Sequence, residues 1–282
     1  MTSPRGVTRT GSILDRIVAD KQAALDRRRA ATREHTLRAI AVNKDDAWGL
    51  SAAIREPRGR APTDARVQIV AEVKKASPSK GIFDARFDYK RIARDYVLGG
   101  AAGISVLTEE NYFLGSLEHL RDIRRELYAD FPGTRPSLLR KDFLISPYEL
   151  VESLAYGADN VLLIAALLDD ALLRDMIQRA SAEGLDALVE VHTEAEAERA
   201  VAAGGTLFGI NNRDLHTFEV DLATTERIRP LLPLDAVVIG ESGVHTKADV
   251  ERLHAAGVNA ILVGEAFMTS ADIAVKMDEL RI

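Results

Sequence analysis

Glu72 and Lys74 are two charged residues inside a stretch that otherwise has the composition of a buried strand. The stretch, IVAEVKKASPSKG at residues 69–81, begins with aliphatic residues and ends in a Ser/Pro/Gly loop that carries Lys80. Because side chains alternate along a strand, Glu72 and Lys74 share one face. A buried ammonium without a partner is costly to desolvate. We therefore expect the two side chains to form an ion pair in a polar pocket, and Lys75 to point the other way.

Three other apolar runs end in polar residues of complementary chemistry. LLRKDF places Lys141 and Phe143 on one face, LVEVH ends near Glu190, and GINNRD places Asn211 and Arg213 on one face. Lysine and carboxylate side chains are the groups that general acid–base catalysis uses. Each residue alone is more often a solvated residue at the rim of a sheet. Their coincidence at four strand ends is what indicates an active site.

Two further runs end in small residues, as a phosphate site requires. VIGESGV contains Ser242 and Gly243, and LVGEAF contains Gly264 and Glu265. Glycine lets an anion approach the backbone N–H groups, and barrel enzymes often bind phosphate in the loops after strands seven and eight. The alternative is a pair of tight turns. Glu265 is unfavourable beside a phosphate unless its side chain points away.

The elements that must position these residues form a regular series of eight short apolar runs separated by amphipathic helical stretches. The series spaces its strands about 27 residues apart, which is typical of a βα repeat, and predicts an α/β fold, a (β/α)8 TIM barrel at residues 66–282. Residues 1–65 predict an N-terminal helical extension packed on the barrel, so that residues 1–282 form a single domain. The alternative, an open doubly wound sheet, is weakened because no G-x-G-x-x-G motif follows the first run. The eight runs are QIVAEV, GISVLT, SLLRK, NVLLIA, ALVEV, LFGI, AVVIG and AILVG.

The loop after the first strand is long for a connection between a strand and a helix. It reads ASPSKGIFDARFD at residues 76–88, whereas such loops are usually about 2–6 residues. Its composition suits a lid that closes over an anionic substrate and excludes water. We expect Lys80 to approach the ligand when this lid closes.

The composition excludes several classes of function. The 282 residues contain no cysteine, so disulfides, thiolate nucleophiles and cysteine metal sites are excluded, and we expect a cytoplasmic protein. The six histidines form no metal-binding pair; His192 and His245 lie just past strands and are interpreted as neighbours of helix caps. The net charge of −6 gives no basic footprint for nucleic acid. No apolar stretch has the length of a signal or a transmembrane helix, so we expect no membrane partner.

Seven segments of the chain together resemble the signature segments of the indole-3-glycerol phosphate synthase family. They occur in order from about residue 65, and the helical extension is also similar to that family's. The resemblance implies a carboxy-lyase of tryptophan biosynthesis. It would close the ring of 1-(2-carboxyphenylamino)-1-deoxyribulose 5-phosphate and release indole-3-glycerol phosphate, carbon dioxide and water, without cofactor or metal. The segments are IVAEVKKASPSKG, SVLTEENYFLGS, LLRKDF, ALVEVH, GINNRDLHTFEVD, VIGESGV and ILVGEAFM.

The resemblance also implies roles for the catalytic residues. Lys141 would be the general acid, and Glu190 the base or the group that stabilises positive charge on the ring nitrogen. Glu72 and Asn211 would position these groups, and Lys74 would hold the substrate carboxylate or phosphate and share the acid role. We expect the two lysines to lower each other's pKa toward the working range.

The remaining site residues would bind the substrate. The aryl ring would pack on Phe113 and Phe143, and the backbone around Ser242–Gly243 and Gly264–Glu265 would bind phosphate. Many relatives carry serine where this chain has Glu265, which removes a hydroxyl donor, adds a charge and should weaken phosphate binding. The other expected substrate-binding residues are Ser77, Arg213 and Glu241.

Two other classes of function remain open at this point. The first is another phosphosugar enzyme on the same barrel, either an isomerase or an aldolase whose lysine forms an imine with its substrate. The second is a barrel without catalytic activity that serves as an assembly scaffold, since fold alone does not specify function. The expected partner is a small-molecule substrate that joins an anthranilate ring to a phosphosugar. We expect a monomer, and association with other tryptophan-pathway enzymes stays open.

Overall fold

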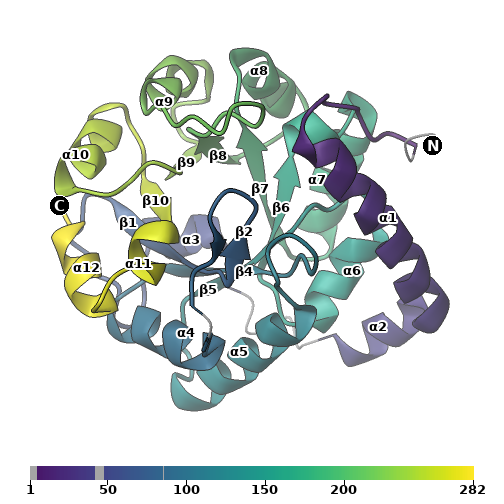
Figure 1. Cartoon of the computed structure of the whole chain (residues 1–282), viewed down its shortest axis with the longest axis horizontal. Helices are drawn as coiled ribbons and strands as arrows, with labels where there is room; N and C mark the ends of the chain where they lie inside the picture. Colours follow the sequence, from purple (N-terminus) through teal and green to yellow (C-terminus); the bar gives the residue numbers. More distant parts are fainter. Residues whose placement is uncertain (1–4, 42–47, 85) are drawn as a thin grey trace.

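The centre of the molecule is a closed barrel of eight parallel strands, seen end-on in Figure 1. The computed structural model describes residues 5–41, 48–84 and 86–282. Its strands follow one another around the barrel in chain order and close where β1 pairs with β10. Each barrel strand coincides with one of the eight apolar runs, so the predicted (β/α)8 fold is confirmed. The strands are β1 Gln68–Val73, β4 Gly103–Leu107, β5 Ser137–Lys141, β6 Asn160–Ile164, β7 Asp186–Val191, β8 Leu207–Asn211, β9 Val237–Glu241 and β10 Ala260–Val263.

An outer ring of helices surrounds the barrel (Figure 1). Several begin at side chains that accept the first free N–H groups, such as Ser116, Asp169 and Thr246. Their apolar faces and the strands form one core of small and branched aliphatic residues. The helices are α4 Tyr89–Leu98, α5 Leu117–Asp130, α6 Tyr148–Ala155, α7 Asp170–Ala182, α8 Glu194–Ala202, α9 Ala223–Ile228, α10 Lys247–Ala255, α11 Glu265–Met268 and α12 Ile273–Glu279, with short 3₁₀ turns at Ala165–Leu167 and Arg229–Leu231.

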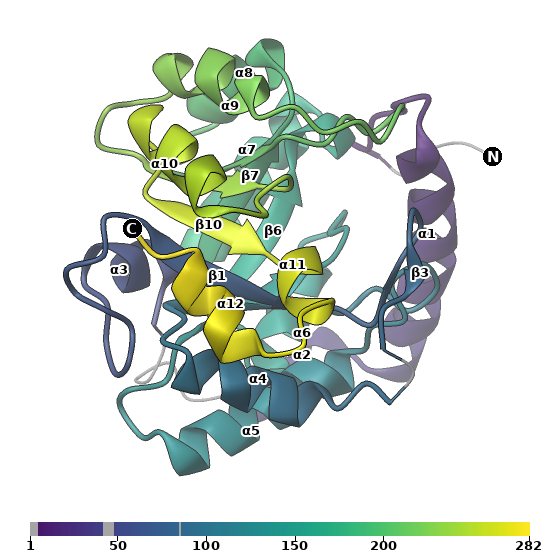
Figure 2. The same ribbon diagram turned by 60° about the vertical axis from the view of Figure 1, so that its left-hand side comes forward.

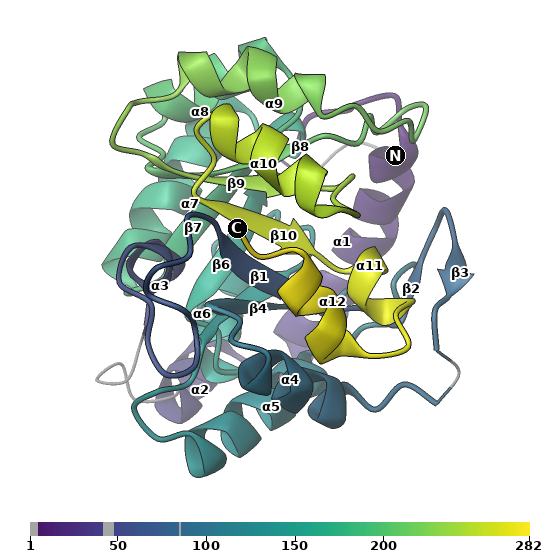
Figure 3. The same ribbon diagram turned by 90° about the vertical axis from the view of Figure 1, so that its left-hand side faces the viewer.

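Three helices precede the barrel: α1 Ile13–Ala31, α2 Glu34–Ile40 and α3 Leu50–Arg55. Figures 2 and 3 show α1 at the end of the barrel toward which the strands point, and α3 at the opposite end. The segment DDAWGLSAAI at residues 45–54 has the pattern of a short helix that includes Trp48, but α3 begins after this residue, and residues 45–47 lie outside the described residues. In the described part of the chain, no helix is long and apolar enough to cross a membrane.

Helix α1 is joined to the barrel by buried ion pairs. The Lys21 ammonium lies 2.5 Å from a carboxylate oxygen of Asp142 and 3.1 Å from one of Glu149. The Arg140 guanidinium, which is fully buried, reaches the Asp142 carboxylate at 3.0 Å. Burial would raise the pKa of Asp142, but Lys21 and Arg140 outweigh it and hold that pKa well below its ordinary value. Arg140 and Asp142 flank Lys141 in the chain. The ion pair between Lys21 and Asp142 therefore fixes the extension beside a candidate catalytic residue.

Candidate active site

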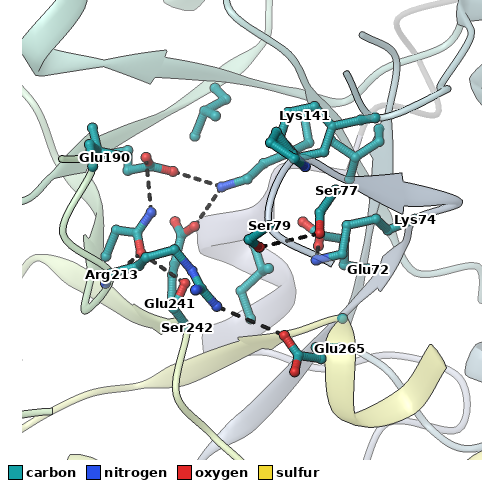
Figure 4. A pocket seen from close by; sticks show the side chains of 18 of the residues that line it. Glu72, Lys74, Ser77, Ser79, Lys141, Glu190, Arg213, Glu241, Ser242 and Glu265 are labelled. Atoms are coloured by element: carbon teal, nitrogen blue, oxygen red, sulfur yellow. Dashed lines mark hydrogen bonds and ion pairs between the residues drawn. The ribbon is translucent and has the colours of Figure 1, made fainter. Parts of the chain in front are cut away.

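A cavity of about 190 Å³ lies at the carboxyl ends of the barrel strands (Figure 4). In a parallel barrel this end collects the side chains that follow every strand. All the predicted site residues line the cavity, and their chemical roles remain predictions. They are Glu72, Lys74, Ser77, Phe113, Lys141, Phe143, Glu190, Asn211, Arg213, Glu241, Ser242, Gly243, Gly264 and Glu265.

Lys141 lies between two carboxylates that come from other strands. Its Nζ is 2.7 Å from an oxygen of Glu190 and 2.5 Å from an oxygen of Glu241 (Figure 4). Burial alone would lower the pKa of Lys141, but the attraction of Glu190, Glu241 and Glu72 outweighs it and raises that pKa above its ordinary value. The expectation of a lowered pKa is therefore wrong, because the nearest charged groups are anions and not the second lysine.

The two carboxylates beside Lys141 differ in their affinity for a proton. Burial would raise the pKa of Glu190, but Lys141 and His192 lower it below its ordinary value. Burial and the repulsion of Glu190 raise the pKa of Glu241 to about 7, against the attraction of Lys141. The cluster therefore holds one carboxylate that stays ionised and one that exchanges a proton near neutral pH.

Glu72 and Lys74 form the expected ion pair, with Lys74 Nζ 2.6 Å from a carboxylate oxygen of Glu72. The pair lies against the backbone at the end of β10. A β-carbon added to Gly264 would come within 2.5 Å of the Glu72 carboxylate and 3.1 Å of Lys74 Nζ. Glycine at this position therefore leaves the space that the ion pair occupies.

Asn211 joins the cluster of Lys141, Glu190 and Glu241 to the loop after β9. Its Nδ2 donates to Glu190 Oε1 at 3.2 Å, and its Oδ1 accepts from Ser242 Oγ at 2.9 Å and from the Arg213 backbone N–H at 3.1 Å. These bonds fix which end of the amide faces Glu190. The structure thus gives Asn211 contacts that suit the positioning role expected for it.

The loops after β9 and β10 form the expected phosphate end of the cavity. Ser242 and Gly243 both have positive φ values, 63° and 82°, and Gly264 precedes the first turn of α11. The Glu265 carboxylate lies 3.2 Å from Lys80 Nζ and 3.9 Å from a guanidinium nitrogen of Arg213. It therefore faces cations at the rim of the cavity.

The loop after β1 forms a small hairpin over this end of the barrel. Its strands, β2 Ala76–Ser77 and β3 Gly81–Ile82, pair antiparallel, and Gly81 and Ile82 are exposed. Figures 2 and 3 place it at the same end of the barrel as α1. Lys80 at its tip reaches Glu265 but is not among the residues that line the cavity, whereas Ser77 is. The proposed motion of this lid stays a prediction.

Within the described residues, no group of three or more histidine or carboxylate side chains is placed to hold a metal ion. The polar side chains that line the cavity include lysine, carboxylate and amide groups. The residues predicted to donate a proton, to accept one and to bind an anion all line one cavity.

A model of the indole-3-glycerol phosphate synthase family matches residues 14–280 of the chain. The chain belongs to this family. It is 45% identical over 268 residues to the indole-3-glycerol phosphate synthase of Dehalococcoides mccartyi, covering 95% of this chain and 99% of that protein. It is 42% identical over 271 residues to that of a Roseiflexus species, covering 95% and 98%. The resemblance inferred from the sequence is thus confirmed.

Solved structures with lower sequence identity show the same fold. A 3-hexulose-6-phosphate synthase matches with a TM-score of 0.58 at 17% identity, over 76% of this chain and 98% of that one. A thiamine phosphate pyrophosphorylase from Pyrococcus furiosus matches with a TM-score of 0.55 at 18% identity, over 77% and 94%. At these identities the likeness extends to the barrel alone.

Membership of the indole-3-glycerol phosphate synthase family makes the chain an enzyme, a carboxy-lyase of tryptophan biosynthesis. The family match covers both the helical extension from residue 14 and the whole barrel. The readings as a barrel without activity or as an unrelated phosphosugar enzyme are therefore set aside. What the comparisons leave open is how the individual residues divide the chemistry.

The wall of the cavity includes residues that the sequence did not assign to it. Helix α1 contributes Ile13, Leu14 and Ile17, which complete an apolar wall together with Phe113 and Phe143, whose ring centroids are 5.9 Å apart. The apolar face of residues 13–18 was visible in the sequence, but a helix face packed on a barrel and one that closes its mouth have the same pattern.

His192 was interpreted as a neighbour of a helix cap, and the structure adds a contact with the active site. Its backbone N–H does donate to the Glu196 carboxylate at the start of α8. Its ring, however, lies 3.3 Å from Glu190 Oε1. His245 matches the simpler interpretation, because its backbone N–H donates to Asp249 at the start of α10.

Proposed function

We propose that Lys141 and Glu190 carry the proton transfers that close the indole ring in this cavity. The observation that supports the proposal is the contact of the Lys141 ammonium with two carboxylates, Glu190 and Glu241, in a cavity that an aromatic pair also lines. The substrate would be 1-(2-carboxyphenylamino)-1-deoxyribulose 5-phosphate. Its aryl carbon must bond to its ketone carbon, which requires an acid, a base and a fixed ring.

Lys141 is the proposed general acid. It would protonate the ketone oxygen as the new carbon–carbon bond forms, the substrate carboxylate would leave as carbon dioxide, and the new hydroxyl would leave as water with a second proton. An ammonium whose pKa is raised is a poor donor on its own. A proton on Glu241, whose pKa of about 7 allows it, removes one of the charges that hold the proton on Lys141. Glu241 would thus tune the acid.

Glu190 is the proposed base. It stays ionised beside Lys141, and in the last step it would remove the proton from the carbon next to the ring nitrogen as the hydroxyl leaves, which completes the aromatic indole. Asn211 holds one of its oxygens. Phe113 and Phe143 would hold the aryl ring, and Lys74 would bind the departing carboxylate or share the acid role. Glu72 would orient Lys74 through their ion pair.

The phosphate end of the substrate would bind where the chain offers backbone N–H groups and cations together. The turn at Ser242–Gly243 and the start of α11 at Gly264–Glu265 supply the backbone donors, whose orientation favours an anion. Arg213 lies at the same rim. Ser77 lines the cavity from the hairpin and would contact the substrate when the lid closes.

Indole fluorescence after addition of the carboxyphenylamino-ribulose phosphate tests the assignment directly. We expect Lys141→Ala and Glu190→Gln each to lower kcat at least about a hundredfold, the scale of lost acid–base catalysis. An unchanged kcat in both variants contradicts the assigned roles. Borohydride added with substrate tests imine chemistry, and a stable adduct on Lys141 or Lys74 would replace the acid mechanism with a Schiff-base mechanism.

We also propose that the enzyme works as a monomer in the cytoplasm, with neither nucleic acid nor membrane as a partner, and that residues 1–65 and 66–282 act as one domain. The support is that one chain supplies every residue of the proposed site, that the chain has no cysteine and that its net charge is −6. Light scattering of the purified protein at assay concentration tests the first point, since a dimer mass would contradict it.

A further inference from the structure

The side chain of His192 is buried between two carboxylates, and one of them belongs to the catalytic cluster. Its Nε2 lies 3.3 Å from Glu190 Oε1, and its Nδ1 lies 3.3 Å from Glu196 Oε2. The ring is 8% exposed. A neutral imidazole has one donor and one acceptor nitrogen, so it would turn a lone pair toward one of the two carboxylates. Only the doubly protonated ring satisfies both contacts.

The Glu196 carboxylate holds the ring at its outer side. Its Oε2 accepts the His192 backbone N–H at 2.8 Å and also faces Nδ1 of the same residue. The Thr193 side chain in turn accepts the Glu196 backbone N–H, at the N-cap of α8. The start of α8 therefore fixes both the backbone and the ring of His192.

The inner side of the ring faces an oxygen of Glu190 that the lysine does not use. Lys141 contacts Oε2 of Glu190, whereas Asn211 and His192 face Oε1. His192 Nε2 is buried and makes no hydrogen bond among the described residues, although it lies 3.3 Å from Glu190 Oε1. Its contact with Glu190 is a charge interaction that acts on the carboxylate directly.

A second cavity, of about 590 Å³, opens on the far side of His192. Both His192 and Glu196 line it, and Asn211 and Arg213 line this cavity as well as the first one. The ring thus lies between Glu190, which lines the first cavity, and the second cavity, whose volume exceeds that of an imidazole ring. Further charged residues at the rim of this cavity include Arg9, Glu194, Arg199, Asp214 and Arg227.

We propose that His192 is a positioning residue for the reaction: its protonated ring, held by Glu196, keeps Glu190 ionised and turns it toward Lys141. The inference rests on the proposed role of Glu190 as the base. Burial would lower the pKa of His192, but Glu190 and Glu196 outweigh it and raise that pKa to about 9, so the ring is protonated at neutral pH. Loss of the ring would leave Glu190 Oε1 with its contact to Asn211 but without the positive charge beside it, and would weaken the preference of Glu190 for the ionised form.

Rescue of His192→Ala by added imidazole tests the proposal. A displacement of about 1 Å at a catalytic group can cost about a hundredfold in rate, so we expect kcat to fall about 10- to 100-fold and KM to change less than about threefold. Imidazole can enter from the second cavity, and we expect it to restore kcat in proportion to its protonated fraction. An unchanged kcat, or a loss that imidazole does not restore in a variant with wild-type circular dichroism, overturns the proposal.

Glu196→Gln provides a second test that does not depend on how His192→Ala folds. The amide oxygen can still accept the His192 backbone N–H, but the charge is gone. We expect the alkaline fall in kcat, which follows loss of the ring proton near pH 9 in the parent enzyme, to move to lower pH. An unmoved alkaline limb overturns the proposal. Glu190→Gln, measured in parallel, distinguishes failure of the proposed base from failure of the proposed role of His192. If Glu190→Gln keeps full activity, Glu190 is not the base. If Glu190→Gln is inactive but the His192 and Glu196 variants behave otherwise than expected, only the positioning role of His192 fails.

Discussion

Lys80 and Glu265 form a 3.2 Å ion pair that links the hairpin after β1 to the first turn of α11. The pair lies at the proposed phosphate end of the cavity, where Arg213 is also within 3.9 Å of Glu265. The Glu265 carboxylate therefore lies against the two cations that we propose to attract the substrate phosphate. If the phosphate binds there, it competes with Glu265 for Lys80 and Arg213.

Replacement of Glu265 by serine should strengthen binding of the phosphate group. The substitution removes a negative charge and supplies a hydroxyl donor at the start of α11. Lys80 and Glu265 are partly exposed, so we scale the effect to about 1 kcal/mol, or about fivefold in KM. Inorganic phosphate should inhibit more strongly by a similar factor. Glu265→Gln is the matched control, since it removes the charge without adding the serine hydroxyl, and a KM that rises in both variants would contradict the expectation.

Gly209→Ala should disturb Lys141, the proposed general acid, indirectly through Glu241. Gly209 lies in β8, and a β-carbon there would collide with the Glu241 carboxylate. Displacement of Glu241 would remove a partner of Lys141, and we expect kcat to fall about tenfold or more. Gly204→Ala is a useful control because a β-carbon there meets nothing within 4 Å, although its positive φ of 94° adds backbone strain. Equal kcat values in the two variants would argue against the steric role of Gly209.

The raised pKa of Glu241 predicts a dependence of stability on pH. Its pKa in the folded chain is about 7, against an ordinary value of 4.5, so the folded state binds this proton more tightly than the unfolded state. The contribution of this bound proton to the free energy of unfolding is complete below pH 4.5 and is lost as the pH rises through about 7. The pKa of Glu190 is lowered and that of Lys141 is raised, so neither titrates in this window.

Glu241→Gln should remove this part of the pH dependence. Urea unfolding of the parent and the variant at several pH values between 4.5 and 7 measures it, because a neutral amide has no proton to lose. We expect a smaller decline in the free energy of unfolding for Glu241→Gln. An identical decline in the two proteins would show that another group titrates there.

Lys21→Met should destabilise the protein strongly. The substitution leaves Asp142 and Glu149 buried without the Lys21 ammonium. Removal of one member of a buried ion pair typically costs about 3–5 kcal/mol. The exposed Lys247 provides the control, since Lys247→Met should change the free energy of unfolding by less than about 0.5 kcal/mol. A small effect of Lys21→Met would argue against the proposal that the extension and the barrel form one domain.

The sequence predicts the strands and the face that each side chain uses, but not the distances across the barrel. Alternation along β1 is enough to pair Glu72 with Lys74, two positions apart. The partners of Lys141 come from β7 and β9, and which residues meet depends on the tilt and stagger of the strands. This is why the expected influence of Lys74 on the pKa of Lys141 was wrong, and why Glu241 was seen only as a substrate contact.

His192, which follows β7, is a second residue whose side-chain contacts the sequence does not specify. Residues at the start of a helix have the same pattern whether their side chains face solvent or a neighbouring site. The backbone role of His192 could be predicted from its place before α8. Its ring position depends on Glu196 and Glu190 together, and nothing in their spacing along the chain specifies that their side chains meet.

The ion pair between Lys21 and Asp142 spans 121 residues, and this separation bears on the order in which the chain folds. During synthesis α1 leaves the ribosome long before β5 and α6 exist, so its charged partner cannot be met until more than half of the chain has been made. We expect α1 to gain protection from hydrogen exchange late in refolding, after β5 and α6. The mouth of the barrel would then be closed last, once the acid and its carboxylates are already in place.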